Sequence, residues 1–217
     1  MRTIPANTLL PPKAPNLPVG PVEYNQQYID QLNNVLRLYF NELDNAFKLI
    51  AGSSKGGAYL RFPYGAFQSG VSQTTTANTA TAMTFDTTDY ANGVSIASSS
   101  RITVTNPGIY NLQWSGQFQN TDTQLHDASV WLRVNGTDAT GSNGIVSIPN
   151  SHGGVNGHII AAWNYFVQLN ANDYVELWWS TDDAKVSLQY YAAGATPTRP
   201  TTASIIATLS FVSALPA

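Results

Sequence analysis

The most constraining feature of the sequence is a run of apolar residues spaced alternately three and four positions apart. The run lies between Glu23 and Ile50, a stretch of good helix formers without Gly or Pro. Its members are Ile29, Leu32, Leu36, Tyr39, Leu43, Ala46 and Ile50. This spacing continues for about three heptads and forms one helix stripe, the a/d seam of a coiled coil. The sequence therefore predicts a helix over residues 23–50 that associates with other helices.

Three further apolar residues favour a bundle of three helices. Val35, Phe40 and Phe47 fall at the flanking g and e positions, which widens the apolar face beyond what a two-stranded coil buries. We therefore expect residues 23–50 to form a trimeric coiled coil. The expected partners of the chain are two further copies of itself, in a homotrimer. The same pattern leaves one alternative open, a single amphipathic helix that packs on the core of its own domain.

The segments on either side of this helix have a different composition. Residues 1–22 contain six of the 12 prolines of the chain, and proline disrupts both helices and central strands. This segment is predicted to be an extended arm, which is either a docking peptide for another protein or a disordered tail. Residues 51–57 read AGSSKGG, which ends the helix and predicts a flexible linker.

From residue 58 to residue 217 the sequence predicts an all-β head. Apolar residues alternate with polar ones most clearly within residues 110–114 and 130–134, which predicts strands with one inward face. The expected strands are 58–62, 65–72, 81–86, 93–97, 101–105, 108–120, 128–135, 144–148, 158–169, 173–180, 185–191 and 204–211. Turn signals such as Asn135-Gly136 separate them at the spacing of a β-sandwich. The fold class is therefore mainly β, an antiparallel sandwich preceded by an arm and one α-helix.

The charge content excludes several classes of partner. Charged residues make up 11% of the chain, against roughly 25% in typical soluble domains. The ten Lys and Arg residues are scattered and the net charge is −3, so we expect no nucleic-acid partner. Cysteine is absent, which excludes disulfides and Cys-type zinc sites. The N-terminal segment has no long apolar run, so neither a signal peptide nor a membrane partner is expected.

Seven aromatic residues of the head are candidates for a trimer core or a binding patch. They are Tyr110, Trp114, Trp163, Trp178, Trp179, Tyr190 and Tyr191. Successive residues of a strand point to opposite faces, so either Trp178 or Trp179 must leave the buried side of its own sheet. That side chain either packs against a neighbouring subunit or lies in a binding patch; most of the other aromatic residues are expected in the core or the trimer interface.

Motifs for catalysis or metal binding are absent from the sequence. The histidines are His126, His152 and His158, without the His-x-His or Glu-x-x-His spacing of metal sites, and the adjacent His126 and Asp127 point apart in an extended chain. Nucleophile elbows and phosphate-binding loops are also missing. Carboxylate pairs such as Asp182-Asp183 are expected to cap turns. We therefore predict no enzyme activity, no cofactor and no catalytic or metal residues, and leave open a calcium ion at a loop or on a threefold axis.

The stretch SRITVTNPGIYNLQWSGQF, residues 100–118, resembles the signature strand pair of the complement globular-head and tumour-necrosis-factor superfamily. The later segments VWLRVNG and LNANDYVELWW are similar to elements of that superfamily in the same order, although Asn172 stands where its members usually have Gly. The resemblance covers residues 64–212. It implies a jelly-roll head that forms trimers.

A second resemblance concerns the helix. The run YNQQYIDQLNNVLRLYFNELDN, residues 24–45, is similar to the N-terminal helix of small virion proteins of marine and freshwater tailed phages, a cyanophage-like pattern. The head, which is rich in Thr, Asn and Gly, is similar to their surface proteins. This resemblance implies a virion component whose N-terminal part attaches to the particle and whose head faces outward.

Together these features lead to the hypothesis of a structural component of a phage virion. We expect a homotrimeric short fibre or capsid decoration at the virion surface, attached to other virion proteins through its arm. An alternative is a tail fibre or receptor-binding tip that recognises a host surface glycan. A more distant alternative is a fibre-borne depolymerase, which would need catalytic carboxylates that the spacing alone does not pair.

Overall fold

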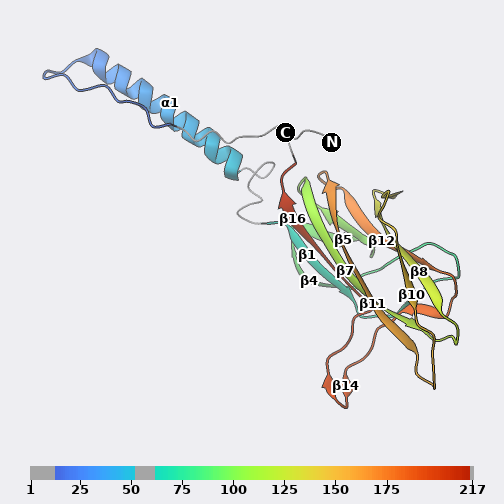
Figure 1. Cartoon of the computed structure of the whole chain (residues 1–217). Helices are drawn as coiled ribbons and strands as arrows, with labels where there is room; N and C mark the ends of the chain where they lie inside the picture. Colours follow the sequence, from blue (N-terminus) through green and yellow to red (C-terminus); the bar gives the residue numbers. More distant parts are fainter. Residues whose placement is uncertain (1–12, 52–61, 216–217) are drawn as a thin grey trace. The chain divides into compact units, whose positions relative to one another are not determined.

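The computed structural model of the chain describes residues 13–51 and 62–215, and for residues 49–51 the backbone alone. It consists of two units, one made of residues 1–61 and 214–217, the other of residues 62–213. The first contains helix α1 (Gln26–Ala51), and the second contains two antiparallel sheets that form a sandwich (Figure 1). The predicted mainly β sandwich with one preceding helix is therefore confirmed.

Helix α1 begins three residues later than expected because Asn25 caps it. The Oδ1 atom of Asn25 accepts a hydrogen bond from the backbone N–H of Tyr28 at 3.1 Å, the contact that an N-cap residue makes. None of the helix side chains that the structure describes is buried: Leu36 and Leu43 of the seam are half-buried, and Ile29 is exposed. The side chain of Ile50 lies outside the described residues. A single copy of α1 therefore leaves its apolar stripe uncovered.

Residues 13–25, which include the described part of the arm (13–22), form neither helix nor strand. The Tyr28 hydroxyl donates a hydrogen bond to the Pro18 carbonyl at 3.2 Å, whereas Leu17, Val19 and Val22 expose their side chains. Residues 1–12 of the predicted arm and residues 52–57 of the predicted linker lie outside the described residues.

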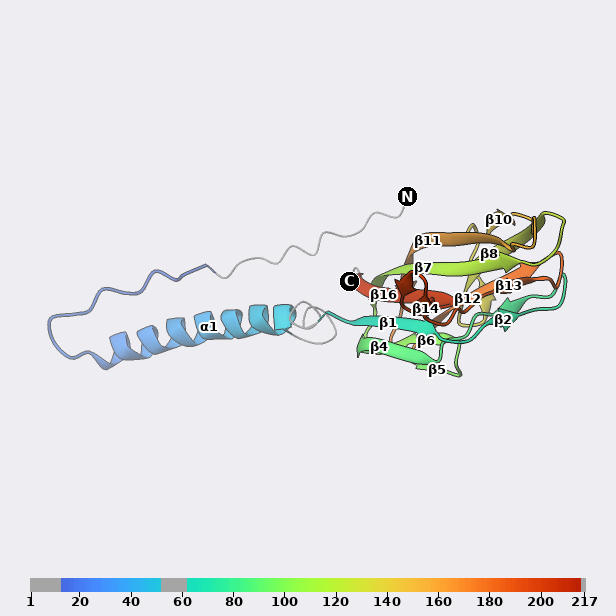
Figure 2. The same ribbon diagram turned by 90° about the horizontal axis from the view of Figure 1, so that it is seen from below.

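One sheet of the sandwich is built around β7 (Gly108–Asn120). Its full length pairs with β11 (Gly157–Leu169), and Figure 2 shows these two strands side by side. The opposite side of β7 pairs with β16 (Ile205–Ser213) and, farther along, with β13 (Val186–Leu188). Beyond β16 follow β1 (Tyr64–Ser69) and β4 (Thr87–Asn92), and β2 (Gln73–Thr74) pairs with β13.

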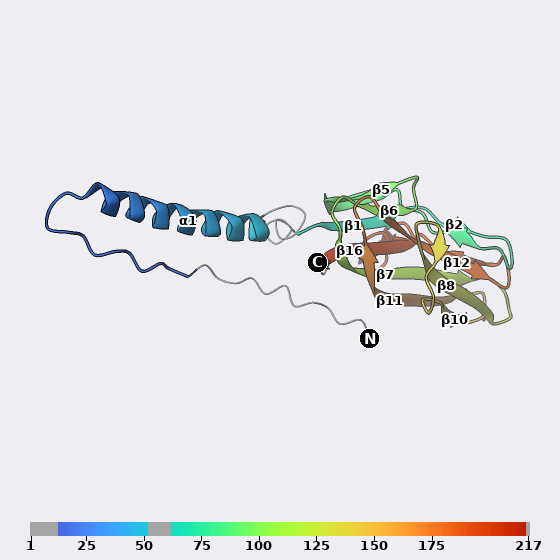
Figure 3. The same ribbon diagram turned by 90° about the horizontal axis from the view of Figure 1, so that it is seen from above.

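The other sheet has the order β5 (Val94–Ala97), β6 (Arg101–Val104), β12 (Tyr174–Thr181), β8 (His126–Val134) and β10 (Gly144–Ile148). Two short strands extend it, β3 (Thr81–Ala82) along β12 and β9 (Thr137–Asp138) along β8. Figure 3 shows β5 and β6 beside each other at one edge of the head. A separate hairpin joins β14 (Gly194–Ala195) to β15 (Thr198–Arg199).

The core lies between the two sheets and follows from the alternation along their strands. Its largest fully buried side chains are Trp179, Tyr110, Phe67, Phe118, Met83, Ile102, Leu112, Leu132, Ile148, Leu169, Leu177 and Leu188. Phe118 of β7 meets Trp179 of β12 edge to face, with ring centroids 5.8 Å apart. Burial of each large apolar side chain contributes roughly 1.5–3 kcal/mol, so this core accounts for most of the packing energy of the head.

The Asn-containing turns carry the backbone conformation that their residues favour. Asn135 and Gly136 both have positive φ, 50° and 80°, the condition for a type I′ hairpin turn between β8 and β9. Asn172 has a φ of 68°, in the left-handed region that Asn tolerates better than most residues. Asn172 can therefore adopt the backbone conformation of the Gly that is usual at this position in the superfamily that residues 64–212 resemble.

Several strand boundaries differ from the expectation. Of the strand expected at 81–86 only residues 81–82 form β3, and the strand expected at 185–191 is limited to Val186–Leu188. Strand β4 was not predicted, because TTDYAN shows no apolar alternation and its side chains are almost all exposed. The strand expected at 58–62 lies outside the described residues except for Phe62, which is not in a strand.

Candidate functional site

The outer face of the sheet formed by β16, β7 and β11 is built from strands without Asp, Glu, Lys or Arg. In their register Ser115 of β7 lies between Ala162 of β11 and Ile206 of β16, so these residues share one surface. Ile160 is 67%, Phe166 65% and Ile206 45% exposed on it. We call this surface the uncharged face; exposed apolar surfaces of this kind mark interaction sites.

A shallow hollow of about 550 Å³ lies on the uncharged face. Its lining consists of Gln113, Trp114, Ser115, Ala162, Trp163, Asn164, Ile206 and Thr208. Ser115 and Ala162 are small and stand side by side, which explains why the surface is depressed there. The hollow offers amide and hydroxyl groups between apolar ones, a surface that suits a neutral protein partner.

Strand β11 forms the edge of its sheet. Among the described strands it pairs with β7 alone, so the other side of its backbone has no ladder partner there. Trp163 is 53% exposed and stacks on Tyr165, with ring centroids 6.3 Å apart, and the Tyr165 hydroxyl donates to the Ser142 carbonyl at 2.7 Å. A long, uncharged edge strand is a surface that proteins normally cover.

The structure corrects the expectation for three of the aromatic candidates. Tyr110, Trp114 and Trp179 lie inside the sandwich, with at most 5% of each side chain exposed, so they belong neither to a trimer core nor to a binding patch. On β7 the side chains of Tyr110 and Trp114 point to the same inward side as Leu112. The Tyr110 hydroxyl donates to the Asn106 carbonyl at 2.7 Å, and burial raises the pKa of Tyr110 to about 12.

Tyr190 and Tyr191 are half-buried near one end of the uncharged face. The Tyr191 hydroxyl donates a hydrogen bond to Oε1 of Gln119 and lies 3.1 Å from Nδ1 of His158 on β11. Burial raises the pKa of Tyr191 and outweighs the opposing charge of Arg199. Tyr191 therefore connects the segment after β13 to strands β7 and β11.

The outer face of the other sheet carries an aromatic and arginine array. Trp178 of β12 lies opposite Trp131 of β8, and the Arg133 guanidinium stands 3.7 Å above the Trp178 ring. Arg101 lies 4.5 Å above the ring of Tyr174. We call these five residues the aromatic–arginine face. Each cation–π contact contributes roughly 0.5–2 kcal/mol and leaves the rings half-exposed to a ligand.

Two carboxylates hold this array in place. Glu176 is almost fully buried; it accepts a hydrogen bond from Ser100 Oγ at 2.6 Å and one from Trp178 Nε1 at 3.4 Å. Asp138 accepts a hydrogen bond from Trp131 Nε1 at 2.7 Å and also bonds Arg133. The hydrogen bonds from Arg133 and Trp131 lower the pKa of Asp138. The aromatic–arginine face is thus fixed by its own hydrogen bonds.

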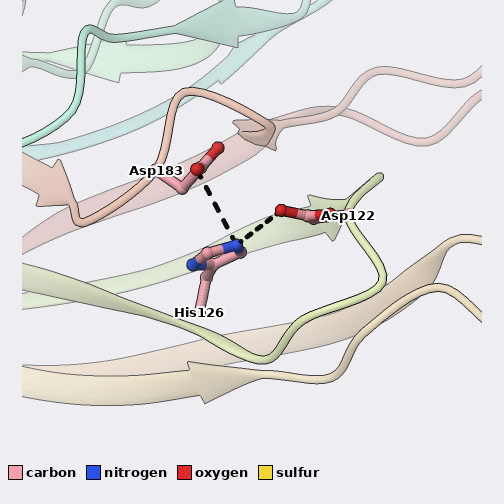
Figure 4. Close-up of side chains that lie close together, drawn as sticks. All are labelled: Asp122, His126 and Asp183. Atoms are coloured by element: carbon pink, nitrogen blue, oxygen red, sulfur yellow. Dashed lines mark hydrogen bonds and ion pairs between the residues drawn. The ribbon is translucent and has the colours of Figure 1, made fainter.

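A third feature is a cluster of ionisable groups around His126 at the start of β8 (Figure 4). Nε2 of His126 lies 3.1 Å from Asp122 Oδ2 and 3.9 Å from Asp183 Oδ2, and Nδ1 lies 3.1 Å from Asp182 Oδ1. The spacing of the sequence pointed to no carboxylate near a histidine, whereas the fold brings three of them to His126. His152 and His158, in contrast, are exposed. The carboxylates come from two turns distant in sequence, and only the fold brings them together.

The cluster shifts the pKa values of its members in opposite directions. Burial alone would lower the pKa of His126, but the hydrogen bond with Asp122 and the charges of the carboxylates outweigh it, so the pKa is raised. The pKa of Asp122 is lowered to about 2 by hydrogen bonds from His126, Lys185 and the Thr123 backbone. The groups thus stabilise one another in their charged forms.

No protein-family model matches the chain, and no curated protein matches it. Within the part of the chain that the structure describes, no helix has the length and hydropathy that a transmembrane helix needs.

Proposed function

We propose that this chain is a structural protein of a bacteriophage virion, a homotrimeric short fibre or capsid decoration located at the virion surface. The observation that carries the proposal is the uncharged face. It exposes Ile160, Phe166 and Ile206 without a single charged residue on three neighbouring strands. Burial of apolar area at about 25 cal/mol per Å² favours covering such a surface with another subunit, and no charge has to be desolvated.

Helix α1 supports self-association independently. Its a/d seam includes Leu32, Leu36 and Leu43, none of which is buried in a single chain. The flanking Phe40 and Phe47 are exposed as well, so the apolar surface is wide enough for two partner helices. Three copies would bury the seam of each helix.

The strand order supports a jelly-roll head. The sheets read β1-β16-β7-β11 and β6-β12-β8-β10 in their central parts, and successive long strands cross from one sheet to the other. A double-sheet jelly roll built from two Greek keys is expected to have crossings of this kind, so the order supports the proposed head.

The described part of the arm supports attachment to another virion protein. Leu17, Val19 and Val22 expose apolar side chains on a segment without secondary structure of its own. An extended peptide of this kind binds by lying along the surface of a partner.

Light scattering coupled to size-exclusion chromatography tests the assembly. We expect a mass three times the 23.4 kDa of one chain at micromolar concentration. A mass of one chain under these conditions would overturn the trimer. Electron microscopy of particles labelled with an antibody against the head tests the location; label on the outside supports the proposal, and its absence contradicts it.

The aromatic–arginine face favours a second candidate function, a receptor-binding tip that recognises a host surface glycan. Half-exposed Trp rings provide stacking surfaces for sugar rings, and arginines donate hydrogen bonds to hydroxyl or acidic groups. If this is correct, Trp178→Ala abolishes binding to host cells and to a glycan array, whereas the matched variant Tyr90→Ala, an exposed aromatic residue on β4, retains it. A blank array and blank cell binding of a protein that still decorates particles would reject this candidate.

A further inference from the structure

The cluster around His126 has features of a metal site that go beyond a network of ion pairs. Asp122, His126 and Asp183 each present one ligand atom to a common point, and these three atoms all lie within 4.8 Å of one another (Figure 4). The side chains are 13–35% exposed, so the point is partly shielded from water. The question is whether each atom is oriented by the rest of the protein.

His126 is oriented by the carboxylate of Asp182, which is not one of the three residues that present ligand atoms. Its Nδ1 lies 3.1 Å from Oδ1 of Asp182, which leaves Nε2 directed toward Asp122 and Asp183. A metal-binding histidine commonly donates its second ring N–H to a carboxylate, which fixes the ring and its tautomer. Asp182 is therefore placed as the orienting partner of a histidine ligand.

The two aspartates each have one oxygen held by the protein. Oδ1 of Asp122 accepts the Thr123 backbone N–H at 2.7 Å and lies 3.1 Å from Lys185 Nζ, whereas Oδ2 faces His126. Oδ1 of Asp183 accepts the Lys185 backbone N–H at 2.8 Å. Oδ2 of Asp183 faces Nε2 at 3.9 Å, beyond hydrogen-bond reach, and accepts no hydrogen bond from the described residues.

From this arrangement we propose that Asp122, His126 and Asp183 bind a divalent transition-metal ion, for which Zn²⁺ is the best match. One imidazole nitrogen and two carboxylate oxygens are ligands that Zn²⁺ accepts, with a fourth position left for water. Tetrahedral bonds of about 2.0–2.2 Å place ligand atoms roughly 3.3–3.6 Å apart. The separations of 3.1 and 3.9 Å from Nε2 need only small side-chain adjustments.

The nature of the ligands discriminates between ions. Ca²⁺ takes six to eight oxygen ligands, which three residues with one nitrogen do not supply. Lys185 pairs with the Oδ1 atom of Asp122, not with the ligand atom Oδ2, so its ammonium group can stay in place when the ion binds. Two carboxylates balance the charge of a divalent ion.

The ion would join two connections between the sheets. Asp122 lies between β7 and β8, and Asp183 lies between β12 and β13; both connections lead from one sheet to the other. Metal binding to the native state alone raises the stability by mass action. The inference is independent of the proposed virion function.

Calorimetric titration of tag-free, chelator-treated full-length chain with ZnCl₂, and separately with CaCl₂, tests the site. We expect one Zn²⁺ per chain, a higher melting temperature with Zn²⁺, and no saturable Ca²⁺ binding. Asp182→Asn should lower the Zn²⁺ affinity about 10–100-fold. His126→Gln should abolish binding, and the matched variant His152→Gln, which changes an exposed histidine elsewhere, should retain it.

The absence of saturable Zn²⁺ binding at millimolar concentration overturns the site, as does His126→Gln binding as tightly as the unchanged chain. If circular dichroism shows that His126→Gln does not fold, Asp183→Asn decides in its place, because Asp183 is more exposed than His126. Retained binding in Asp183→Asn likewise overturns the site, and loss of binding in the folded variant supports it.

Discussion

Trp178 and Trp179 are consecutive in β12 and lie on opposite faces of the same sheet. Trp179 is fully buried and meets Phe118 edge to face, whereas Trp178 is half-buried beneath the guanidinium of Arg133 at 3.7 Å. One indole therefore belongs to the core of the head and the other to its surface. The two residues make a matched pair in which the same substitution has different consequences.

We predict that Trp179→Ala lowers the free energy of unfolding of the head by about 3–5 kcal/mol. Trp178→Ala removes chiefly a cation–π contact and should cost about 0.5–2 kcal/mol. Trp179→Phe should cost less than Trp179→Ala, because phenylalanine keeps most of the buried ring volume; the Nε1 donor that it removes has no hydrogen-bond partner among the described residues. Urea denaturation measures all three; equal losses for the two alanine variants would contradict the assignment of faces.

In the helix, we predict that Leu36→Glu breaks the trimer. The substitution would place three carboxylates together in the seam, where burial without a partner is unfavourable. Leu38→Glu is the matched control, because Leu38 is 54% exposed and lies outside the seam. Sedimentation velocity should show a smaller species for Leu36→Glu and an unchanged trimer for Leu38→Glu. An unchanged trimer in both variants would argue for the alternative in which α1 does not associate with its copies.

On the head, we predict that Ala162→Arg weakens self-association at least tenfold. Ala162 borders the hollow of the uncharged face, so a guanidinium there would be buried without a partner in an interface. Ser95→Arg is the control, since Ser95 is exposed on β5 of the other sheet. The stability of the single chain should change by less than about 0.5 kcal/mol in both variants. Sedimentation equilibrium compares them, and equal association would place the interface elsewhere.

The buried Tyr110 predicts a loss of stability at alkaline pH. Burial raises the pKa of Tyr110 from 10.0 to about 12, so the folded chain keeps a proton that the unfolded chain releases. The contribution of protonated Tyr110 to the free energy of unfolding is therefore fully present below about pH 10, and it is lost as the pH rises toward 12. Thermal unfolding between pH 8 and 12 should show a shallower decline for Tyr110→Phe, which also loses the hydrogen bond to Asn106 at every pH. An identical decline would contradict the shift.

Local patterns predicted the elements of this chain well because their causes are local. The seam of α1 follows from spacing within one segment, and Asn135-Gly136 forms its turn through its own φ preferences. The alternation within residues 110–114 likewise predicted an inward face, and Tyr110, Leu112 and Trp114 are all buried. The alternation did not decide between the core of the head and a trimer interface, because that depends on the strands that pack against β7.

The candidate sites, by contrast, depend on contacts between distant segments. His126 meets Asp182 and Asp183 only because β8 and β12 pair side by side. The uncharged face is assembled from three strands that no short sequence window contains together. Counting charges strand by strand would have shown that β7, β11 and β16 lack them, but the sequence does not state that these strands are neighbours.

The position of β16 between β1 and β7 has a consequence for the timing of folding. Ser204, just before β16, hydrogen-bonds the Ser69 carbonyl across a separation of 135 residues. The position between β1 and β7 therefore stays empty until β16, the last strand of the head, pairs there. The chain must bring segments that are distant in sequence together before the contacts between them can form. Topologies of this kind fold in about milliseconds to seconds, not microseconds. Until then residues 109–116 of β7 lack their partner on one side, so the folding chain is most vulnerable to wrong pairing before its final strand is inserted.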